Sequence, residues 1–388
     1  MGKTLEVFLV FLKLGLTSFG GPIAHLGYFR SEFVTRRHWL DDTSYADLVA
    51  LAQFLPGPSS SQVGMGLGLM RAGYGGMVAA WIGFTLPSAL LLIGVAYLSM
   101  QGNGEYVARL SHGLMVVAVA VVAQAVFQMS QSLTPDWPRR VMALAVMAVL
   151  LLWSSALSQI IVLIAGALIG YAALKPDTTP GAASLGVSVS RRTGTVLILC
   201  FLVLLGVLPL LATDGGLSWR LADIFYRAGA LVFGGGHVVL PILEASLVPQ
   251  GLIAQGDFFA GYGAAQAVPG PLFSFAAYIG AVVQGGGMAQ AAVCLLAMFA
   301  PSFLLVPGVM PFWSGLSQRQ DMRAAMAGVN ASVVGLLAAA FVTPIFTSAI
   351  MSVFDLAVAL AAFAALQWRV VPVWLVVVIT GLAGLVLV

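Results

Sequence analysis

The stretch FLKLGLTSFGGPIAHL at residues 11–26 decides the fold, because the chain repeats it as FYRAGALVFGGGHVVL at residues 225–240. A second block, AQFLPGPSSS at residues 52–61, recurs as AQAVPGPLFS at residues 265–274. The shared residues are mainly glycines and prolines within apolar sequence, and both residue types interrupt helices. A duplicated apolar unit whose helices break at matching places is typical of a secondary transporter.

The composition predicts an integral membrane protein with many helical spans. Hydrophobic residues make up 60% of the 388 residues and charged residues only 8%, with a mean hydropathy of +1.02. A soluble domain carries about 25% charged residues. The small excess of 17 Lys and Arg over 14 Asp and Glu argues against a nucleic-acid partner and suits the positive-inside rule. With only Cys200 and Cys294 present, no disulfide framework is expected.

The predicted fold is an all-α membrane protein of two homologous inverted repeats, with about nine full spans and four broken segments, or up to thirteen spans. We expect one repeat at residues 1–174 and the other at 213–388, separated at 175–212 by a linker and an unpaired helix over 195–212. The stretches long enough to cross ~30 Å of hydrocarbon are residues 77–100, 113–133, 141–158, 159–174, 195–212, 289–311, 324–349, 351–367 and 371–388.

Four further segments are long but interrupted, and they either cross the membrane or enter it and turn back. They are residues 5–29, 44–70, 220–248 and 257–283. Re-entrant segments place thirteen Lys and Arg on the cytoplasmic side and two outside, against ten and five if every segment crosses. The positive-inside rule therefore favours re-entrance. In either arrangement the unpaired helix inverts the second repeat, and the amino terminus is expected in the cytoplasm.

The breaks themselves are candidate anion sites. A helix that starts after Pro-Gly-Pro presents free N–H groups and about half a positive charge at its amino end, which suits a negatively charged ligand. The alternative is that the breaks are only kinks with close helix packing. The residues expected at the breaks are Ser18, Gly20, Gly21, His25, Pro56, Gly57, Ser59, Ser60, Ser61, Gly234, Gly235, Gly236, His237, Pro269, Gly270 and Ser274.

Charged and amide side chains near the breaks are further candidates. Lys13 and Arg227 occupy the same repeat position, and a cation in an apolar helix is functional by default, although both could snorkel to the headgroups. Gln53 and Gln266 precede each Pro-Gly-Pro by one turn and could donate to the same ligand. The acidic candidates for proton coupling are Asp47, Glu244, Asp257 and Asp355, of which Asp47 and Asp257 could instead cap helices.

No enzyme or cofactor site is legible in the sequence. There is no G-x-x-x-x-G-K-[ST] loop for ATP, no HExxH or Cys/His cluster for a metal, and no recognisable nucleophile and base. We therefore expect neither catalysis nor a bound cofactor or metal. The expected partners are a small anion and the lipid bilayer, and a homodimer is compatible with the sequence.

The blocks FGGPIAHLGYFRSEFV at 19–34 and QFLPGPSSSQ at 53–62, with FGGGHVVLP at 233–241 and QAVPGP at 266–271, resemble the chromate ion transporter family. The resemblance is to its long, two-domain branch and covers nearly the whole chain except 175–212. It implies export of chromate across the bacterial inner membrane and chromate resistance, with sulfate as a structural mimic and competitor. Transport of another small anion such as sulfate, an anion channel, and a component of a larger membrane assembly remain as alternatives.

Overall fold

The computed structural model describes residues 2–101, 105–174, 189–368 and 371–387, and these form helices without strands. The predicted all-helical class is therefore confirmed for the part of the chain that is described. Lys175, Arg369 and residues 175–188 of the predicted linker at 175–194 lie outside it. Within these described ranges, six helices are long and apolar enough to cross a membrane, namely Ser59–Gln101, Ala108–Leu133, Ala156–Ala173, Arg191–Asp214, Met288–Leu316 and Gln320–Ala349.

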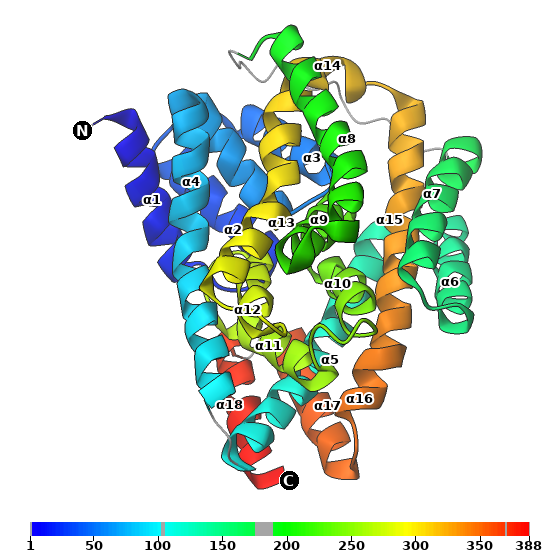
Figure 1. The fold of residues 1–388 in the computed structure, drawn as a ribbon. Coiled ribbons are helices and arrows are strands. Elements are labelled where there is room, and N and C mark those ends of the chain that lie inside the picture. Colours follow the sequence, from blue (N-terminus) through cyan, green and yellow to red (C-terminus); the bar gives the residue numbers. More distant parts are fainter. Residues whose placement is uncertain (1, 102–104, 175–188, 369–370, 388) are drawn as a thin grey trace.

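Helix α8 (Arg191–Asp214) lies between two parts of the chain (Figure 1). The first part contains α1 (Lys3–Thr17), α2 (Gly21–Phe29), η1 (Arg30–Arg36), α3 (Asp42–Phe54), α4 (Ser59–Gln101), α5 (Glu105–Leu133), α6 (Trp137–Leu152) and α7 (Ala156–Ala173). Helix α8 follows. The second part contains α9 (Gly216–Leu231), η2 (Gly236–Val238), α10 (Val239–Leu247), α11 (Gln255–Ala267), η3 (Leu272–Ser274), α12 (Phe275–Val282), α13 (Met288–Val309), η4 (Met310–Phe312), α14 (Trp313–Leu316), α15 (Gln320–Ala340), η5 (Phe341–Phe346), α16 (Thr347–Ala349), α17 (Val353–Gln367) and α18 (Val373–Leu387).

Several boundaries differ from the sequence expectation. The expected pair of spans at 141–158 and 159–174 is divided earlier, between α6 and α7, because Ser155 forms a capping box with Ser158 and starts a new helix there. The expected helix at 195–212 begins at Arg191, where Ser190 caps its amino end. Helix α4 contains a kink at Ala72 and Gly73, where the backbone leaves the helical region. Its first part, from Ser59 to Arg71, therefore forms a hairpin with the long second part.

Both broken segments of the first part begin and end at the same end of the molecule. Glu6, near the start of α1, forms ion pairs with Arg37 at 3.5 Å and Arg71 at 3.0 Å. Arg37 follows α2 and η1, and Arg71 ends the first part of α4, so the chain has returned to its starting level each time. Figure 1 shows the amino terminus and α14 at one end of the molecule and the carboxyl terminus at the other.

The second part contains the same two hairpins, with contacts between their bases. Arg220, near the start of α9, donates to Gln250 at 2.8 Å. The amide of Gln284 donates to the carbonyl of Leu252 at 3.0 Å. The turns at 248–254 and 283–287 therefore lie beside the start of α9, and the glycine and proline breaks lie at the opposite tips of these hairpins.

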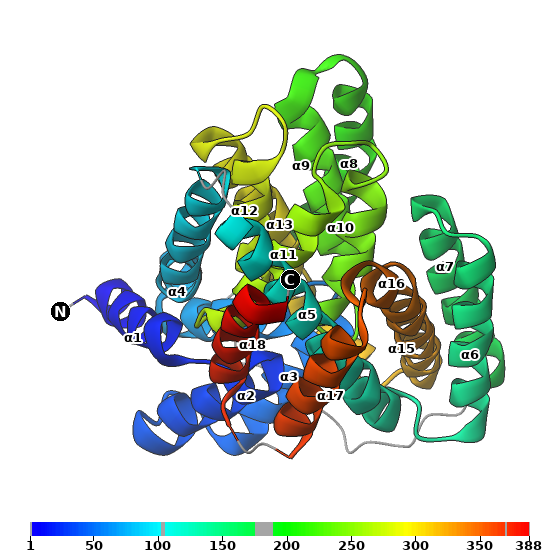
Figure 2. The ribbon, with the colours of Figure 1, turned by 90° about the horizontal axis from the view of Figure 1, so that it is seen from below.

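The long helices are exchanged between the two parts of the chain. Helix α5 packs against α17 and α18 from the end of the chain, and α15 packs against α6 and α7 (Figure 2). Glycines allow the close approach: a Cβ on Gly113 would lie 2.6 Å from the carbonyl oxygen of Thr380, and one on Gly170 would lie 2.8 Å from the Cα of Gly328. Small residues at crossing points are the usual basis of helix packing in membranes.

Helix α8 lies on the outside of the bundle, against α9 and α13. Only 6% of its most apolar window is buried inside the protein, although this is the most hydrophobic candidate span. Most of its Leu and Val side chains are therefore exposed to the surroundings, which suits contact with lipid hydrocarbon.

Candidate anion site

The four helix breaks meet at the middle of the molecule and are joined by two hydrogen bonds between the parts of the chain. The amide of Gly57 donates to the carbonyl of Val232 at 2.7 Å, and the amide of Gly270 donates to the carbonyl of Ser18 at 2.9 Å. Each Pro-Gly-Pro break thus contacts the end of the first broken helix of the other part. The breaks that the repeat pattern predicted are therefore brought together in space.

Glycine is required at the centre of both Pro-Gly-Pro breaks. The φ angles of Gly57 and Gly270 are +123° and +101°, a region that L-residues rarely adopt. A Cβ on Gly57 would lie 2.8 Å from Oγ of Ser302, and one on Gly270 would lie 2.9 Å from Oγ of Ser88. These serines follow Pro87 and Pro301, a pair of Pro-Ser dipeptides that the two parts also share.

Buried polar side chains connect the hairpin tips. Nε2 of His25 lies 3.2 Å from the carbonyl oxygen of Ser18, and Nδ1 lies 3.4 Å from Oγ of Ser60. Oγ of Ser274 lies 2.6 Å from Oγ of Ser88. All five residues are at most 3% exposed. His25 therefore links the first break to the second within its own hairpin pair, rather than facing solvent.

The amides of Gly57 and Gly270, which lie within the Pro-Gly-Pro breaks, do not face a ligand. The expectation of free N–H groups on the helices that start after these breaks stays a prediction. Both glycine amides donate to carbonyl oxygens of the other part of the chain. The reason is that each break lies against another break, and a buried amide needs an acceptor. The hydroxyls of Ser18 and Ser61 are buried nearby without a partner, so unused polar capacity remains in this region.

A cavity of about 480 Å³ opens beside the joined breaks and is lined by both parts of the chain. The first part contributes the start of α2 and one face of α5, and the second contributes the break before α10, the end of α11 and the turn between α17 and α18. Its polar side chains are Tyr28, Gln124, Gln128, His237 and Gln266. Among the described residues that line it there is no Lys, Arg, Asp or Glu.

The amino end of α2 borders this cavity. Gly20, Gly21, Ile23 and Ala24 line it, and no side chain caps the helix start. The first N–H groups of a helix have no acceptor within the helix, so those of Gly21 and Ile23 are donors beside the cavity. The φ angles of +101° at Gly20 and +78° at Gly21 make the turn that exposes them. An uncapped helix amino end favours a negatively charged ligand.

Amide and imidazole groups complete the donors around the cavity. Nε2 of Gln266 is buried without a hydrogen-bond partner, so a donor beside the cavity is available to a ligand. Gln124 is held by its bond to the carbonyl of Leu366 at 2.8 Å, and His237 by Tyr262 at 2.6 Å. The site is therefore preorganised from neutral donors, which can hold an oxyanion by hydrogen bonds from several directions.

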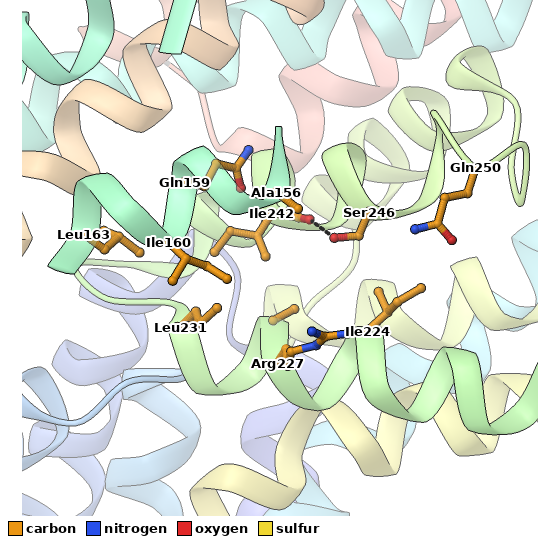
Figure 3. Close-up of a pocket in the computed structure, with 11 residues that line it drawn as sticks. Ala156, Gln159, Ile160, Leu163, Ile224, Arg227, Leu231, Ile242, Ser246 and Gln250 are labelled. Atoms are coloured by element: carbon orange, nitrogen blue, oxygen red, sulfur yellow. Dashed lines mark hydrogen bonds between the residues drawn. The ribbon is translucent and has the colours of Figure 1, made fainter. Parts of the chain in front are cut away.

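Lys13 and Arg227 are not brought together. Lys13 is exposed on α1 and is absent from the described lining of the cavity. Arg227 forms an ion pair with Asp223 one turn earlier on α9, and it lines a separate cavity of about 130 Å³ between α7, α9 and α10. Figure 3 shows Arg227 on α9, with Gln159 and Ser246 on the other side of this cavity. Asp223 is nearly fully buried, so the cation there balances an internal carboxylate.

The other predicted residues are distributed as follows. Gln53 and Asp47 line a third cavity between α3 and α15. A Cβ on Gly234 would lie 3.1 Å from Leu133 and 3.2 Å from Val333, and one on Gly236 would lie 3.4 Å from Phe273 and 3.7 Å from Pro22, so both parts of the chain surround these glycines. Ser59 and Pro269 are half-buried. Gly235 lies near Met129. The carbonyl oxygen of Pro56 accepts from Nε2 of Gln62 at 2.6 Å.

The acidic candidates have different surroundings. Asp355 forms the capping box of α17 and bonds His112 at 2.8 Å, which gives it a structural role at the start of that helix. Asp47 and Asp257 do not cap: Asp41 caps α3, and Ala254 at the start of α11 has no side-chain bond. Glu244 is half-buried on α10. Among these four, only Asp47 lines one of the cavities described here.

Sequence reasoning missed Gln124 and Gln128. The signal was present, because two glutamines four residues apart in an apolar helix lie on one face. It also missed Asp223, although Asp and Arg four residues apart on a helix are a recognisable ion pair. Uncharged polar residues inside the predicted spans were therefore a better guide to the lining of the central cavity than Lys13 and Arg227.

These features define the class of protein: it is a multi-pass membrane protein, with helices broken around a shared central cavity. The chromate transporter family model matches the chain twice, at residues 5–171 and 219–385. The chain therefore belongs to the chromate transporter family.

Relatives of similar length carry related names. The chain is 27% identical to a probable chromate transport protein of Synechococcus elongatus, over 97% of this chain and 93% of the relative. It is 28% identical to a chromate transport protein of Pseudomonas aeruginosa, over 86% and 79% of the two chains. A chromate transport protein of Cupriavidus metallidurans is 25% identical, over 87% and 81%. No solved structure matches the chain.

Proposed function

We propose that the protein is a secondary carrier that exports chromate from the bacterial cytoplasm across the inner membrane and thereby gives resistance to chromate. The observation that carries the proposal is the central cavity: it borders the uncapped amino end of α2 and the unpartnered amide of Gln266, and it takes residues from both parts of the chain. The choice of chromate as the anion rests on the names of the relatives. The hydrogen-bond donors for it line the cavity.

The substrate is bound by hydrogen bonds rather than by a fixed countercharge. Gln124, Gln128, His237 and Gln266 contribute neutral groups. A neutral site binds a dianion without holding it so tightly that release becomes slow, which a carrier requires. Tetrahedral dianions of similar size present the same acceptors, so sulfate is expected to compete.

The driving force follows from the charge of the substrate. Moving one charge through 100 mV is worth ~2.3 kcal/mol, so a dianion that leaves an inside-negative cell gains about 4.6 kcal/mol from twice that term. The membrane potential is therefore sufficient for export. Proton antiport would be a second source of energy, and export of a dianion does not require it.

The proposed topology has re-entrant hairpins, a cytoplasmic amino terminus, and inverted repeats at 1–174 and 213–388 joined by 175–212. The contacts of Glu6 with Arg37 and Arg71 support it, because each broken segment returns to its own starting end. The matching contacts at Arg220 and Leu252 support the same arrangement for the second repeat. Breaks from opposite sides then meet near the midplane.

The test is uptake of labelled chromate by everted membrane vesicles that contain the protein. We expect saturable initial rates that increase with an inside-positive potential and fall when sulfate is added. Vesicles without the protein are the control. Uptake equal to this control would contradict chromate transport, and a current that rises linearly with chromate concentration would indicate a channel instead.

A further inference from the structure

The cavity between α3 and α15 differs in character from the central one. It has a volume of about 350 Å³ and carries both charges and amides: Asp47, Gln53, Ser132, Arg139, Arg323 and Asn330, which we call the polar vestibule. Its wall also includes Trp313 and Leu316 of α14, which lies at the end of the molecule that carries the amino terminus (Figure 1).

Several polar atoms in the vestibule have unused hydrogen-bonding capacity. Oδ2 of Asp47, Oδ1 of Asn330 and Nε1 of Trp313 are buried without a partner. Arg139 is fixed in place, because Asp136 accepts from both its backbone amide and its guanidinium, and its side chain is 20% exposed. Two guanidinium groups from different helices thus border one small cavity. Asp47 is the carboxylate among its described lining residues, and Asp136 pairs with Arg139 from outside that lining.

The corresponding place in the other repeat is closed. Helix α11, the counterpart of α3, packs along α5 and α18. A Cβ on Gly263 would collide with the carbonyl oxygen of Leu114, so these helices are in direct backbone contact. The position equivalent to Gly263 at the repeat offset of 213 is Ala50, and Ala50 lines the vestibule instead. The same interface is therefore packed in one repeat and separated in the other.

The vestibule and the central cavity follow one another along α5. Gln128 lines the central cavity, and Ser132, one turn later, lines the vestibule. Gly234 lies at the boundary, where a Cβ would be 3.1 Å from Leu133, 3.2 Å from Val333 and 3.4 Å from Met129. Apolar side chains around a glycine therefore form the partition between the two cavities.

From this geometry we infer that the polar vestibule is the cytoplasmic mouth of the transport path, where Arg139 and Arg323 collect a tetrahedral oxyanion before it reaches the central cavity. This inference rests on the proposed function. The structure is then the inward-open state, and closure of α3 onto α15 with separation of α11 from α5 gives the opposite state. Asp47 opposes the two arginines and keeps binding in the mouth weak.

The test is the kinetics of chromate uptake by everted vesicles. Arg323→Gln and Arg139→Gln should each raise the apparent KM by about fivefold, since a unit charge several ångströms from a dianion in water is worth about 1 kcal/mol, and should leave the maximal rate unchanged. Asp47→Asn should lower the KM. Added salt should raise the KM of the unmodified protein more than that of the arginine variants.

The matched control is Arg319→Gln, because Arg319 lies at the same end but is exposed and paired with Asp321 at 2.6 Å. We expect no change in its KM, and Arg323→Lys should retain a normal KM because it keeps the charge. Unchanged KM values for both arginine variants would contradict the inference that the polar vestibule is the mouth of the transport path. An unmodified protein that does not take up chromate would instead contradict the proposed function.

Accessibility gives an independent readout that does not depend on transport. In a chain with Cys200→Ser and Cys294→Ala, a cysteine at Ala50 or Ala327 should react with an anionic, membrane-impermeant thiol reagent faster in everted than in right-side-out vesicles. A cysteine at the buried Ala264 of α11 is the control for the closed repeat. Faster labelling at Ala264 than at Ala327 would show that the open end has been assigned to the wrong side.

Discussion

The amide nitrogen of Gly57 lies 2.7 Å from the carbonyl oxygen of Val232, and this hydrogen bond ties a break in the first repeat to a break in the second. Gly270 and Ser18 form the equivalent bond in the opposite sense at 2.9 Å. Each repeat supplies one donor and one acceptor at the centre. A displacement of either pair of hairpins is therefore transmitted to the other by the backbone itself.

Gly57→Ala should abolish chromate transport and lower stability. The φ of +123° disfavours an L-residue by roughly 1–2 kcal/mol, and the new Cβ would lie 2.6 Å from Nε2 of Gln62. The control is Gly94→Ala, because Gly94 is helical and has open space around it. Thermal unfolding in detergent and vesicle uptake measure both effects. Normal uptake by Gly57→Ala would show that the joined breaks are not part of the transport path.

Gln266→Glu should eliminate chromate binding with little change in folding. The substitution keeps the size of the side chain but replaces a donor beside the central cavity with a negative charge, which repels a dianion by several kcal/mol in a poorly solvated site. Gln128→Glu should act in the same direction. Gln131→Glu is the control on α5, because Gln131 is exposed and does not line the cavity. Equal uptake by the Gln266 and Gln131 variants would exclude the cavity as the site.

Arg227→Gln should impair the protein mainly through Asp223. Removing the cation leaves a nearly fully buried carboxylate unpaired, which is expected to destabilise by about 3 kcal/mol. The double variant Arg227→Gln with Asp223→Asn should recover both stability and transport. If stability returns and transport does not, Arg227 contacts the substrate directly. Lys13→Gln should transport normally, because Lys13 is exposed on α1.

Single cysteines test the topology in a background without Cys200 and Cys294. Cysteines at the exposed positions Thr35 and Gln318 should be shielded from an impermeant thiol reagent in intact cells, whereas one at Gln250 should react. Thr35 and Gln318 belong to the end with the amino terminus, and Gln250 belongs to the base of the second repeat's hairpins. Labelling at position 35 from outside would reject the re-entrant arrangement of the first repeat.

The positions of the breaks could be predicted from sequence, because Gly20, Pro56, Gly234 and Pro269 interrupt helices through their own backbone chemistry. The meeting of these breaks depends on tertiary contacts between Gly57 and Val232, and no local signal encodes it. Gln266 could be singled out from the sequence because it lies one turn before a break, and the structure places it beside the central cavity. Which amide lines the cavity depends on helix rotation, and hydrophobic periodicity is a weak guide where lipid and protein are equally apolar.

Lys13 and Arg227 show most clearly what the sequence alone does not predict. Lys13 and Arg227 hold the same repeat position, so duplication suggested a shared role. Arg227 pairs with Asp223 one turn earlier on its helix, whereas the residue one turn before Lys13 is Leu9. Equivalent positions in a duplicated chain therefore share a backbone environment without sharing an electrostatic one. The hydrogen bond between His112 and Asp355 was likewise invisible, because 243 residues separate the partners.

The exchange of helices between the repeats sets the order in which the protein can be completed. Helix α5 is synthesised in the first third of the chain, but around Gly113 it packs against Thr380, Gly381 and Gly384 near the carboxyl end. Until α18 emerges, this part of α5 must remain against lipid or a chaperone. Loss of the last helix would therefore remove a packing partner from α5, which is made early. Misfolding of α5 can be recognised only after the end of the chain has been synthesised.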